Sequence, residues 1–153
     1  IHTASNGLCF NTFVVLNEQG NPVGFQAPQA AVLIAKQLTE DLSNPGGYQA
    51  VVNRRLPRHL KQLVRPTQVR ISSPTKAYSE LTVIAADRPG LLARIGQLFA
   101  ELSIEVLSAR ITTLGERVED VFTIRVPNGN AIVDRERIYL LENTLRQRLD
   151  SLA

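Results

Sequence analysis

Residues 81–95 have the sequence LTVIAADRPGLLARI, in which a strand pattern is followed directly by a helix pattern. Up to residue 86, apolar side chains occupy alternate positions, as in a strand with a buried face. From Leu91 onward, they recur at the three- and four-residue spacing of an amphipathic helix. The turn between them has two interpretations. Either Asp87 caps the helix and Pro89 starts it, or free backbone N–H groups also receive a small anion or carboxylate there.

Two more strands and another helix are predicted downstream. Segments 104–112 and 118–126 both alternate, and a short turn between them indicates an antiparallel hairpin. Asp134 is a candidate N-cap for the last helix. On one face of the strand at 104–112 we expect Leu107, Ala109 and Ile111. The stripe of the last helix consists of Ile138, Leu141, Leu145, Leu149 and Leu152.

This order of elements predicts an α+β domain over residues 78–153. Strand, helix, strand, strand and helix belong to the ferredoxin-like βαββαβ arrangement, in which an antiparallel sheet carries its helices on one face. No strand is expected after the last helix. The fourth strand is therefore either borrowed from elsewhere or absent, which would leave an open edge.

Residues 1–72 are expected to form a truncated first copy of the same unit. Residues 1–15 can be laid on 111–124 with one extra residue in the turn. A helix from Pro28 corresponds to the last helix of the second copy, and a strand at 67–72 is expected to close the first copy. One face of that helix carries Ala31, Ile34, Leu38 and Leu42. Because a first strand and helix are missing from this copy, we expect the chain to complete its sheets as a homodimer.

Positive charge is concentrated between the two copies. Residues 42–79 contain seven basic residues and no acidic one, while the rest of the chain has ten basic and 14 acidic residues. The centre of this stretch, about 53–66, is predicted to be a linker. It carries no stacking pattern of aromatic residues, so docking on an acidic protein surface is favoured over binding of phosphate or nucleic acid.

Catalytic, metal-bound and membrane-spanning classes find no support. Cys9 is the single cysteine and cannot form an intrachain disulfide, which favours a reducing cytoplasmic setting. With His2 and His59 it forms no zinc cluster. Glu119 and Asp120 are neighbours on a strand and point to opposite faces, so they do not form an acid–base pair. No apolar run approaches the ~20 residues that span a bilayer. A chain that opens on Ile and lacks Met is expected to be a fragment.

The residues also carry a resemblance to a known family. Residues 81–95 resemble the first strand and helix of an ACT domain, the small-molecule-sensing version of this fold. Residues 109–122, with the sequence ARITTLGERVEDVF, and residues 54–60, with the sequence RRLPRHL, are more particular. Together these segments resemble the C-terminal tandem ACT region of bacterial bifunctional uridylyltransferase/uridylyl-removing enzymes, over essentially the whole chain.

That resemblance implies an allosteric role in nitrogen regulation. In the family, catalytic domains outside this segment attach UMP from UTP to the PII signalling protein and remove it, using a divalent metal such as magnesium. The ACT pair senses glutamine. The segment itself is then expected to be non-catalytic and free of cofactors, with an amino acid, the catalytic domains and PII as partners. Two alternatives stay open: a ligand-independent dimerisation or docking module, and the ACT regulatory domain of an enzyme of amino-acid metabolism.

The resemblance further implies which residues contact the effector. The loop residues are Asp87, Arg88, Gly90, Leu91 and Leu92, with Ile104 and Glu105 across the cleft. Many amino-acid-binding members have Gly-x-Asn where this chain has Ser103, Ile104 and Glu105. A carboxylate there accepts from a ligand ammonium and repels a ligand carboxylate. No catalytic and no metal-binding residue is expected.

Overall fold

The computed structural model describes most of the chain as two compact units. Its described residues are 2–3, 8–17, 19–25, 27–44 and 66–151. One compact unit comprises Ile1–Phe10 and Val51–Ala153, and the other comprises Asn11–Ala50. Nearly all of the predicted linker, and Leu152 of the predicted helix stripe, lie outside the described residues. The division into sequence copies at 1–72 and 78–153 stays a prediction.

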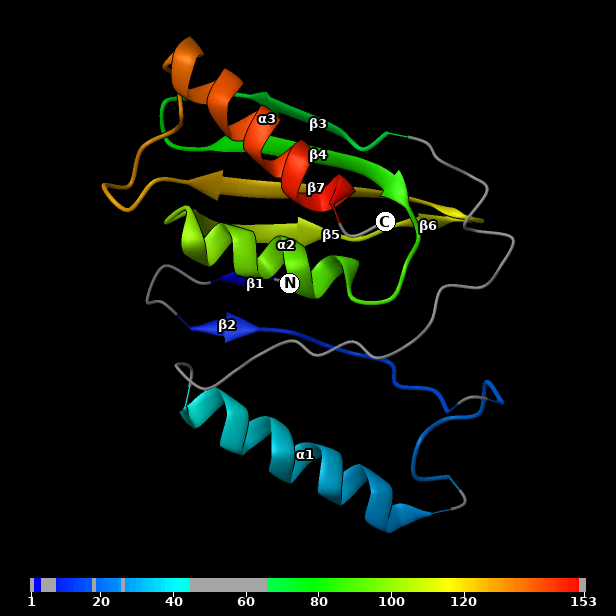
Figure 1. The fold of residues 1–153 in the computed structure, drawn as a ribbon. Helices are drawn as coiled ribbons and strands as arrows, with labels where there is room; N and C mark the ends of the chain where they lie inside the picture. The colour runs from blue at the N-terminus through cyan, green and yellow to red at the C-terminus, as the bar shows by residue number, and fades with distance from the viewer. Residues whose placement is uncertain (1, 4–7, 18, 26, 45–65, 152–153) are drawn as a thin grey trace. The chain divides into compact units, whose positions relative to one another are not determined.

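The first compact unit is built on an antiparallel sheet with the strand order β2-β1-β5-β7-β4-β3 (Figure 1). Its centre is the pair β4 (Ser79–Ala86) and β7 (Arg117–Arg125), which are hydrogen-bonded along their whole lengths. Strand β5 (Glu105–Arg110) lies on the other side of β7. The short β6 (Thr113–Leu114) also pairs with β7. The predicted ferredoxin-like α+β arrangement is therefore confirmed.

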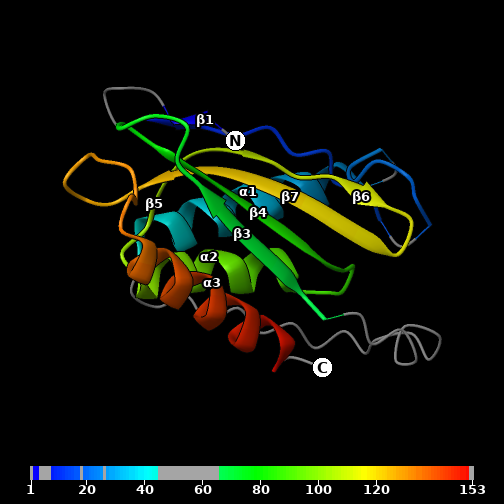
Figure 2. The ribbon, with the colours of Figure 1, turned by 90° about the horizontal axis from the view of Figure 1, so that it is seen from above.

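Two helices cover one face of this sheet, as Figure 2 shows. Helix α2 (Leu91–Glu101) begins one residue after Gly90, whose φ of 81° is in the left-handed region that favours glycine. No side chain caps α2. The expectation that Asp87 caps this helix and Pro89 starts it is therefore wrong, because the backbone reversal at Gly90 sets the start of α2.

Helix α3 (Arg135–Asp150) agrees with its sequence pattern. The Asp134 side chain accepts a hydrogen bond from the Arg137 N–H at 2.9 Å, so the predicted N-cap is confirmed. The buried residues of α3 are Leu141, Leu145 and Leu149, and Ile138 packs against the same core. Strand residues Leu81, Val83, Phe122 and Ile124 form the opposite wall of that core.

Strand β3 (Gln68–Ser72) completes the sheet from an unexpected side. It pairs antiparallel with β4, at the edge where a strand following the last helix would lie in a βαββαβ domain. Val69 and Ile71 are buried in the same core as α3. The expectation that this strand closes the first copy is wrong, because its two apolar side chains complete the core of the second. The alternative of a borrowed fourth strand is confirmed.

One face assignment in β5 is also wrong. The pairing of β5 with β7 shifts register between Val106 and Ser108, so Leu107 occupies a β-bulge. As a result, Val106 and Ala109 pack against the core, although they are three residues apart. Ile111, which was expected on that face, lies beyond the strand and is 41% exposed.

The N-terminal hairpin has the register that the internal repeat predicts. Strands β1 (His2–Thr3) and β2 (Cys9–Phe10) are antiparallel, with Thr3 opposite Cys9. In the aligned positions of the second copy, Thr113 lies opposite Val118. A single pairing of His2 with Ser108 adds β1 to β5. The sheet is thus continuous from the N-terminal hairpin into β5.

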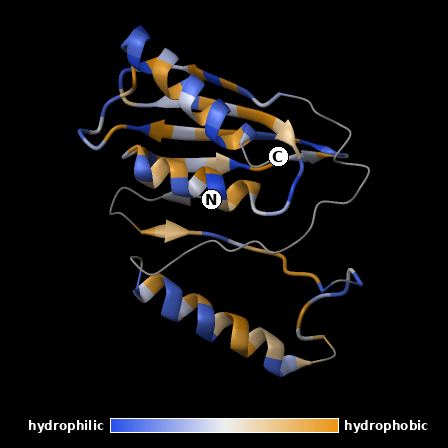
Figure 3. Ribbon diagram, viewed as in Figure 1, coloured by the Kyte–Doolittle hydropathy of each residue, from blue (hydrophilic) through white to orange (hydrophobic). Residues whose placement is uncertain are grey.

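The second compact unit contains helix α1 (Pro28–Ser43), which begins at Pro28 as predicted. Hydrophobic and hydrophilic residues alternate along it (Figure 3). No described residue of α1 is buried, and its apolar side chains at Val32, Leu33, Ile34, Leu38 and Leu42 are between 44% and 72% exposed. Among the described residues, no helix has the length and apolar character needed to cross a membrane.

If β3 completes the core of the second copy, replacing its buried side chain will destabilise that whole domain. We expect Ile71→Ala to lower the free energy of unfolding by about 2–5 kcal/mol, because it leaves a cavity under α3. Ser72→Ala, on the exposed face of the same strand, is the matched control and should change it by less than about 0.5 kcal/mol. Urea denaturation measures both, and equal effects of the two variants would contradict the placement of β3.

Candidate functional site

The loop at residues 87–90 lies where β4 ends, beside the start of β7. The Asp87 N–H donates to the Glu116 carbonyl at 2.8 Å, which fixes the loop to the β6–β7 turn. The carbonyl of Gly90 accepts from the Arg94 N–H at 2.9 Å and so begins the hydrogen-bond pattern of α2. The earlier N–H groups of such a helix have no partner within it and carry the positive end of the helix dipole. This geometry suits a small anionic group.

All five loop residues named from the resemblance line one hollow beside α2. These residues are Asp87, Arg88, Gly90, Leu91 and Leu92. The hollow has a volume of about 310 Å³, at the lower end of the ~300–1,000 Å³ usual for small-molecule sites. Its other walls are formed by Ala93, Ile111, Thr113, Val118 and Asp120. The site therefore combines an apolar floor with carboxylates from two elements.

Asp120 is the polar residue of the hollow that the sequence interpretation missed. It occupies a core-facing position of β7 between the buried Val118 and Phe122 and is only 2% exposed. Its carboxylate accepts from the Thr112 N–H at 3.2 Å. Burial raises the pKa of Asp120, the Thr112 hydrogen bond lowers it, and the negative charge of Asp87 raises it further. A charged residue within an otherwise apolar alternation was the signal that pointed to it.

Arg88 reaches from the loop to the end of α3. Its guanidinium donates a hydrogen bond to the Leu149 carbonyl. Burial lowers the pKa of Arg88, and the carboxylate of Asp150 opposes that shift. The Nε atom of Arg88 is buried and has no hydrogen-bond partner among the described residues. Arg88 therefore lines the hollow while its charged group is engaged by α3.

The other two candidate residues lie at the opposite end of the sheet. Ile104 is 8% exposed in the core, and Glu105 forms an ion pair with Arg125 at 2.7 Å. Arg125 ends β7, whereas the hollow is beside its start, so the two sites are separated by the length of the strand. Ser103, at the glycine position of the family pattern, has a φ of 53°, in the region that favours glycine. Effector contact by Ile104 and Glu105 stays a prediction.

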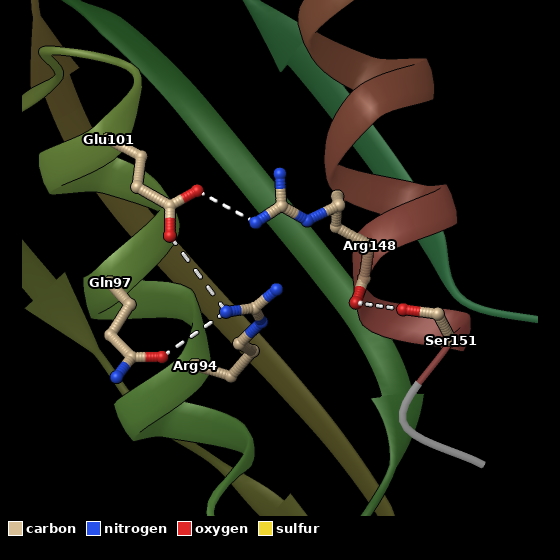
Figure 4. A network of polar contacts seen from close by, with 5 residues as sticks. All are labelled: Arg94, Gln97, Glu101, Arg148 and Ser151. Carbon is tan, nitrogen blue, oxygen red and sulfur yellow. Dashed lines mark hydrogen bonds and ion pairs between the residues drawn. The ribbon is translucent and has the colours of Figure 1, made fainter. Parts of the chain in front are cut away.

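A polar network ties α2 to α3 (Figure 4). Glu101 accepts from Arg148 at 2.8 Å and forms an ion pair with Arg94 at 3.9 Å. Gln97 accepts from the same Arg94 side chain at 3.3 Å. These contacts are partly exposed, so each is expected to contribute little to stability, and together they link α2 to α3. Within the described ranges, no group of three or more His, Cys, Asp or Glu residues could hold a metal ion.

The raised pKa of Asp120 predicts how stability depends on pH. Protonation of Asp120 favours the folded state, and this contribution is complete below the pKa of the unfolded chain and lost as the pH rises through the folded-state pKa. We therefore expect the free energy of unfolding to fall, relative to that of Asp120→Asn, as the pH rises from about 4. Asp87→Asn should make this decrease smaller and end it at a lower pH, because it removes a negative charge that raises the folded-state pKa of Asp120. Urea denaturation at a series of pH values measures this free energy. Parallel curves of unfolding free energy against pH for the unmodified chain and Asp120→Asn would contradict the prediction.

Comparison with known proteins connects this fold and hollow to a family. Residues 79–138 match the ACT domain. The chain is 40% identical over 152 residues to a bifunctional uridylyltransferase/uridylyl-removing enzyme of Pseudomonas putida strain W619, covering 99% of this chain and 17% of that protein. A protein with the same name from Stutzerimonas stutzeri strain A1501 is 39% identical over 150 residues, covering 97% of this chain and 17% of that protein.

No solved structure matches the chain. The chain spans 17% of the length of these curated relatives, and the similarity extends over nearly all of its own residues. The matched ACT segment contains every element that lines the hollow, namely the loop, α2, β6 and β7, together with Ile111 after β5. The chain thus belongs to the ACT domain family through residues 79–138, and as a whole it is related to a segment of the bifunctional uridylyltransferase/uridylyl-removing enzymes.

Proposed function

We propose that the chain is a regulatory module that senses an amino acid, glutamine, on behalf of a bifunctional uridylyltransferase/uridylyl-removing enzyme. The observation that carries this proposal is the hollow at the β4–α2 loop, into which the five loop residues converge. The relation of the whole chain to those enzymes supports the choice of parent protein. Binding of glutamine would then report nitrogen status to the rest of the protein.

The hollow offers a complementary group for each part of a free amino acid. The first turn of α2 would receive the carboxylate, because its N–H groups and dipole favour negative charge. The exposed carboxylate of Asp87 would accept from the ammonium. The exposed Thr113 and the buried Asp120 supply further polar groups in the wall of the hollow for a side-chain carboxamide. Leu91 and Val118 would contact the methylene groups of the ligand.

Such a module acts by binding one arrangement of the protein more tightly than another. We propose that its direct partners are the catalytic domains of the parent chain, which would use UTP and magnesium. Through these domains, the module would act on the PII protein. In this proposal the segment itself performs no catalysis and works in the cytoplasm. Since an effector shifts an equilibrium only by its differential affinity, glutamine must favour one packing of the ACT copies.

A second candidate is a module that dimerises or docks without a ligand. The apolar side chains of α1 support it, because five of them are exposed in a single helix. Phe13, which precedes this helix in the same compact unit, is also exposed. Apolar surface of this kind is typical of segments that pack against another chain.

Glutamine binding is the direct test of the first candidate. In calorimetry on the full-length protein, we expect heat of binding with glutamine and much less with glutamate or serine. Asp87→Asn should weaken binding by about 10-fold or more, because it removes a charge-assisted hydrogen bond. Glu80→Gln, an exposed carboxylate at the far end of β4, is the matched control. If Glu105→Gln weakens binding and Asp87→Asn does not, the site lies at the start of β5 instead; equal heats for all three amino acids would contradict glutamine sensing.

Sedimentation separates the two candidates. A sensor predicts that the assembly state or the sedimentation coefficient changes when glutamine is added. A docking module predicts a dimer that is the same with and without glutamine. Leu38→Asp, on the exposed apolar face of α1, should dissociate that dimer, whereas Lys36→Asp on the same helix should not.

A further inference from the structure

We propose that Arg88 is a positioning residue that couples the loop at 87–90 to strand β3 through the end of α3. This proposal depends on the proposed function in one respect: the effector that would bind at the loop. The path of the coupling is defined by contacts in the first compact unit. Arg88 contacts the end of α3, and the end of α3 holds Thr67, the residue directly before β3.

Asp150 interacts with both Thr67 and Arg88 and so lies in the middle of this path. Its carboxylate accepts from the Thr67 N–H at 3.0 Å, where Thr67 is 3% exposed and stands directly before β3. The same carboxylate stabilises the charge of Arg88. Arg88 in turn donates to the carbonyl of Leu149, the residue before Asp150. One turn of α3 thus holds the effector loop and the start of β3 together.

A second contact shows that α3 is matched to the edge of β3. The Glu142 carboxylate accepts from the Ile71 N–H at 2.7 Å. Glu142 and Asp150 are eight residues apart, about 12 Å along a helix, and Thr67 and Ile71 are four residues apart, about 13 Å along a strand. The two carboxylates therefore meet outward N–H groups of the edge strand at equal spacing. Only the Asp150 contact is connected to the loop.

These contacts lie outside the segment that matches the ACT domain. Thr67, Ile71, Glu142 and Asp150 all fall outside residues 79–138, whereas Arg88 falls inside. Arg88 is thus the member of the path that belongs to the matched domain, and β3 is where the chain enters from the predicted basic linker. A change at the loop would reach that entry point first.

The present arrangement leaves Arg88 able to change partners. Its buried Nε donates to no acceptor among the described residues, and an unpartnered buried donor is unfavourable. A ligand carboxylate in the hollow would provide an acceptor. If Arg88 turned toward it, the Leu149 carbonyl would lose a donor and Asp150 its counter-charge, which would loosen the hold on Thr67.

Amide hydrogen exchange on the full-length protein tests the coupling without any ligand. We expect Arg88→Gln to accelerate exchange at Thr67 by about 10-fold, together with the loop at 87–92, because both lose the same anchor. Asp150→Asn should likewise accelerate exchange at both places, since coupling is reciprocal. If Arg88→Gln does not fold, Arg88→Lys, which keeps the charge but not the planar guanidinium, should give the same pattern at smaller size.

Two control variants distinguish coupling from general loosening of α3. Glu142→Gln should accelerate exchange at Ile71 and leave the loop unchanged, because Glu142 does not contact Arg88. Arg148→Gln breaks the tie between α3 and Glu101 and should leave Thr67 unchanged. Unchanged exchange at Thr67 in Arg88→Gln, or equal acceleration in Arg148→Gln, would overturn the proposal.

Adding glutamine separates this proposal from the proposed function. If glutamine binds and accelerates exchange at Thr67 in the unmodified protein but not in Arg88→Lys, both stand. If glutamine does not bind, the proposed function fails while the variant data still decide the coupling. If it binds and exchange at Thr67 does not change, the coupling is overturned and the sensor stands.

Discussion

The domain depends on one pairing, that of β3 with β4. A ferredoxin-like unit without a strand after its last helix would leave backbone N–H and C=O groups of β4 unpaired above a core that needs covering. Strand β3 fills this edge and contributes Val69 and Ile71 to the core. This pairing also places the start of β3 beside the end of α3, which in turn contacts the loop that lines the hollow. The fold and the proposed regulation therefore share the same strand.

Patterns within single elements were predictable from the sequence, and choices between distant partners were not. Alternation and helical spacing predicted the long strands and both helices of the second copy, and the internal repeat predicted the register of the N-terminal hairpin. Asp134 was predicted as an N-cap from its residue type and position, whereas the short β6 was expected to be part of a turn. The partner of β3 was assigned wrongly because an alternation of two buried residues fits the edge of either copy. The bulge at Leu107 was missed because Val106 and Leu107 are both apolar, so either can be assigned to the core.

In the candidate site, too, the residues that are close in sequence were predictable and the contacts between distant residues were not. The five loop residues are nearly consecutive, so any strand-to-helix turn brings them together, and the structure places them around one hollow. Asp120 joins them through strand pairing, and Arg88 contacts Leu149 across 61 residues, which no local pattern reveals. Ile104 and Glu105 were assigned only from the family resemblance, which implies that they lie across the cleft from the loop. Within one copy, antiparallel pairing places the start of β5 far from the end of β4.

The two ends of the sheet differ in how they can accept another strand. At β3, Glu142 and Asp150 already accept from the N–H groups of Ile71 and Thr67, so a further strand would have to displace two charged acceptors. At the other end lies β2, which corresponds by register to β7 of the second copy. A further strand is thus opposed at the β3 end of the sheet, which is also the end where the junction of Arg88, α3 and β3 lies.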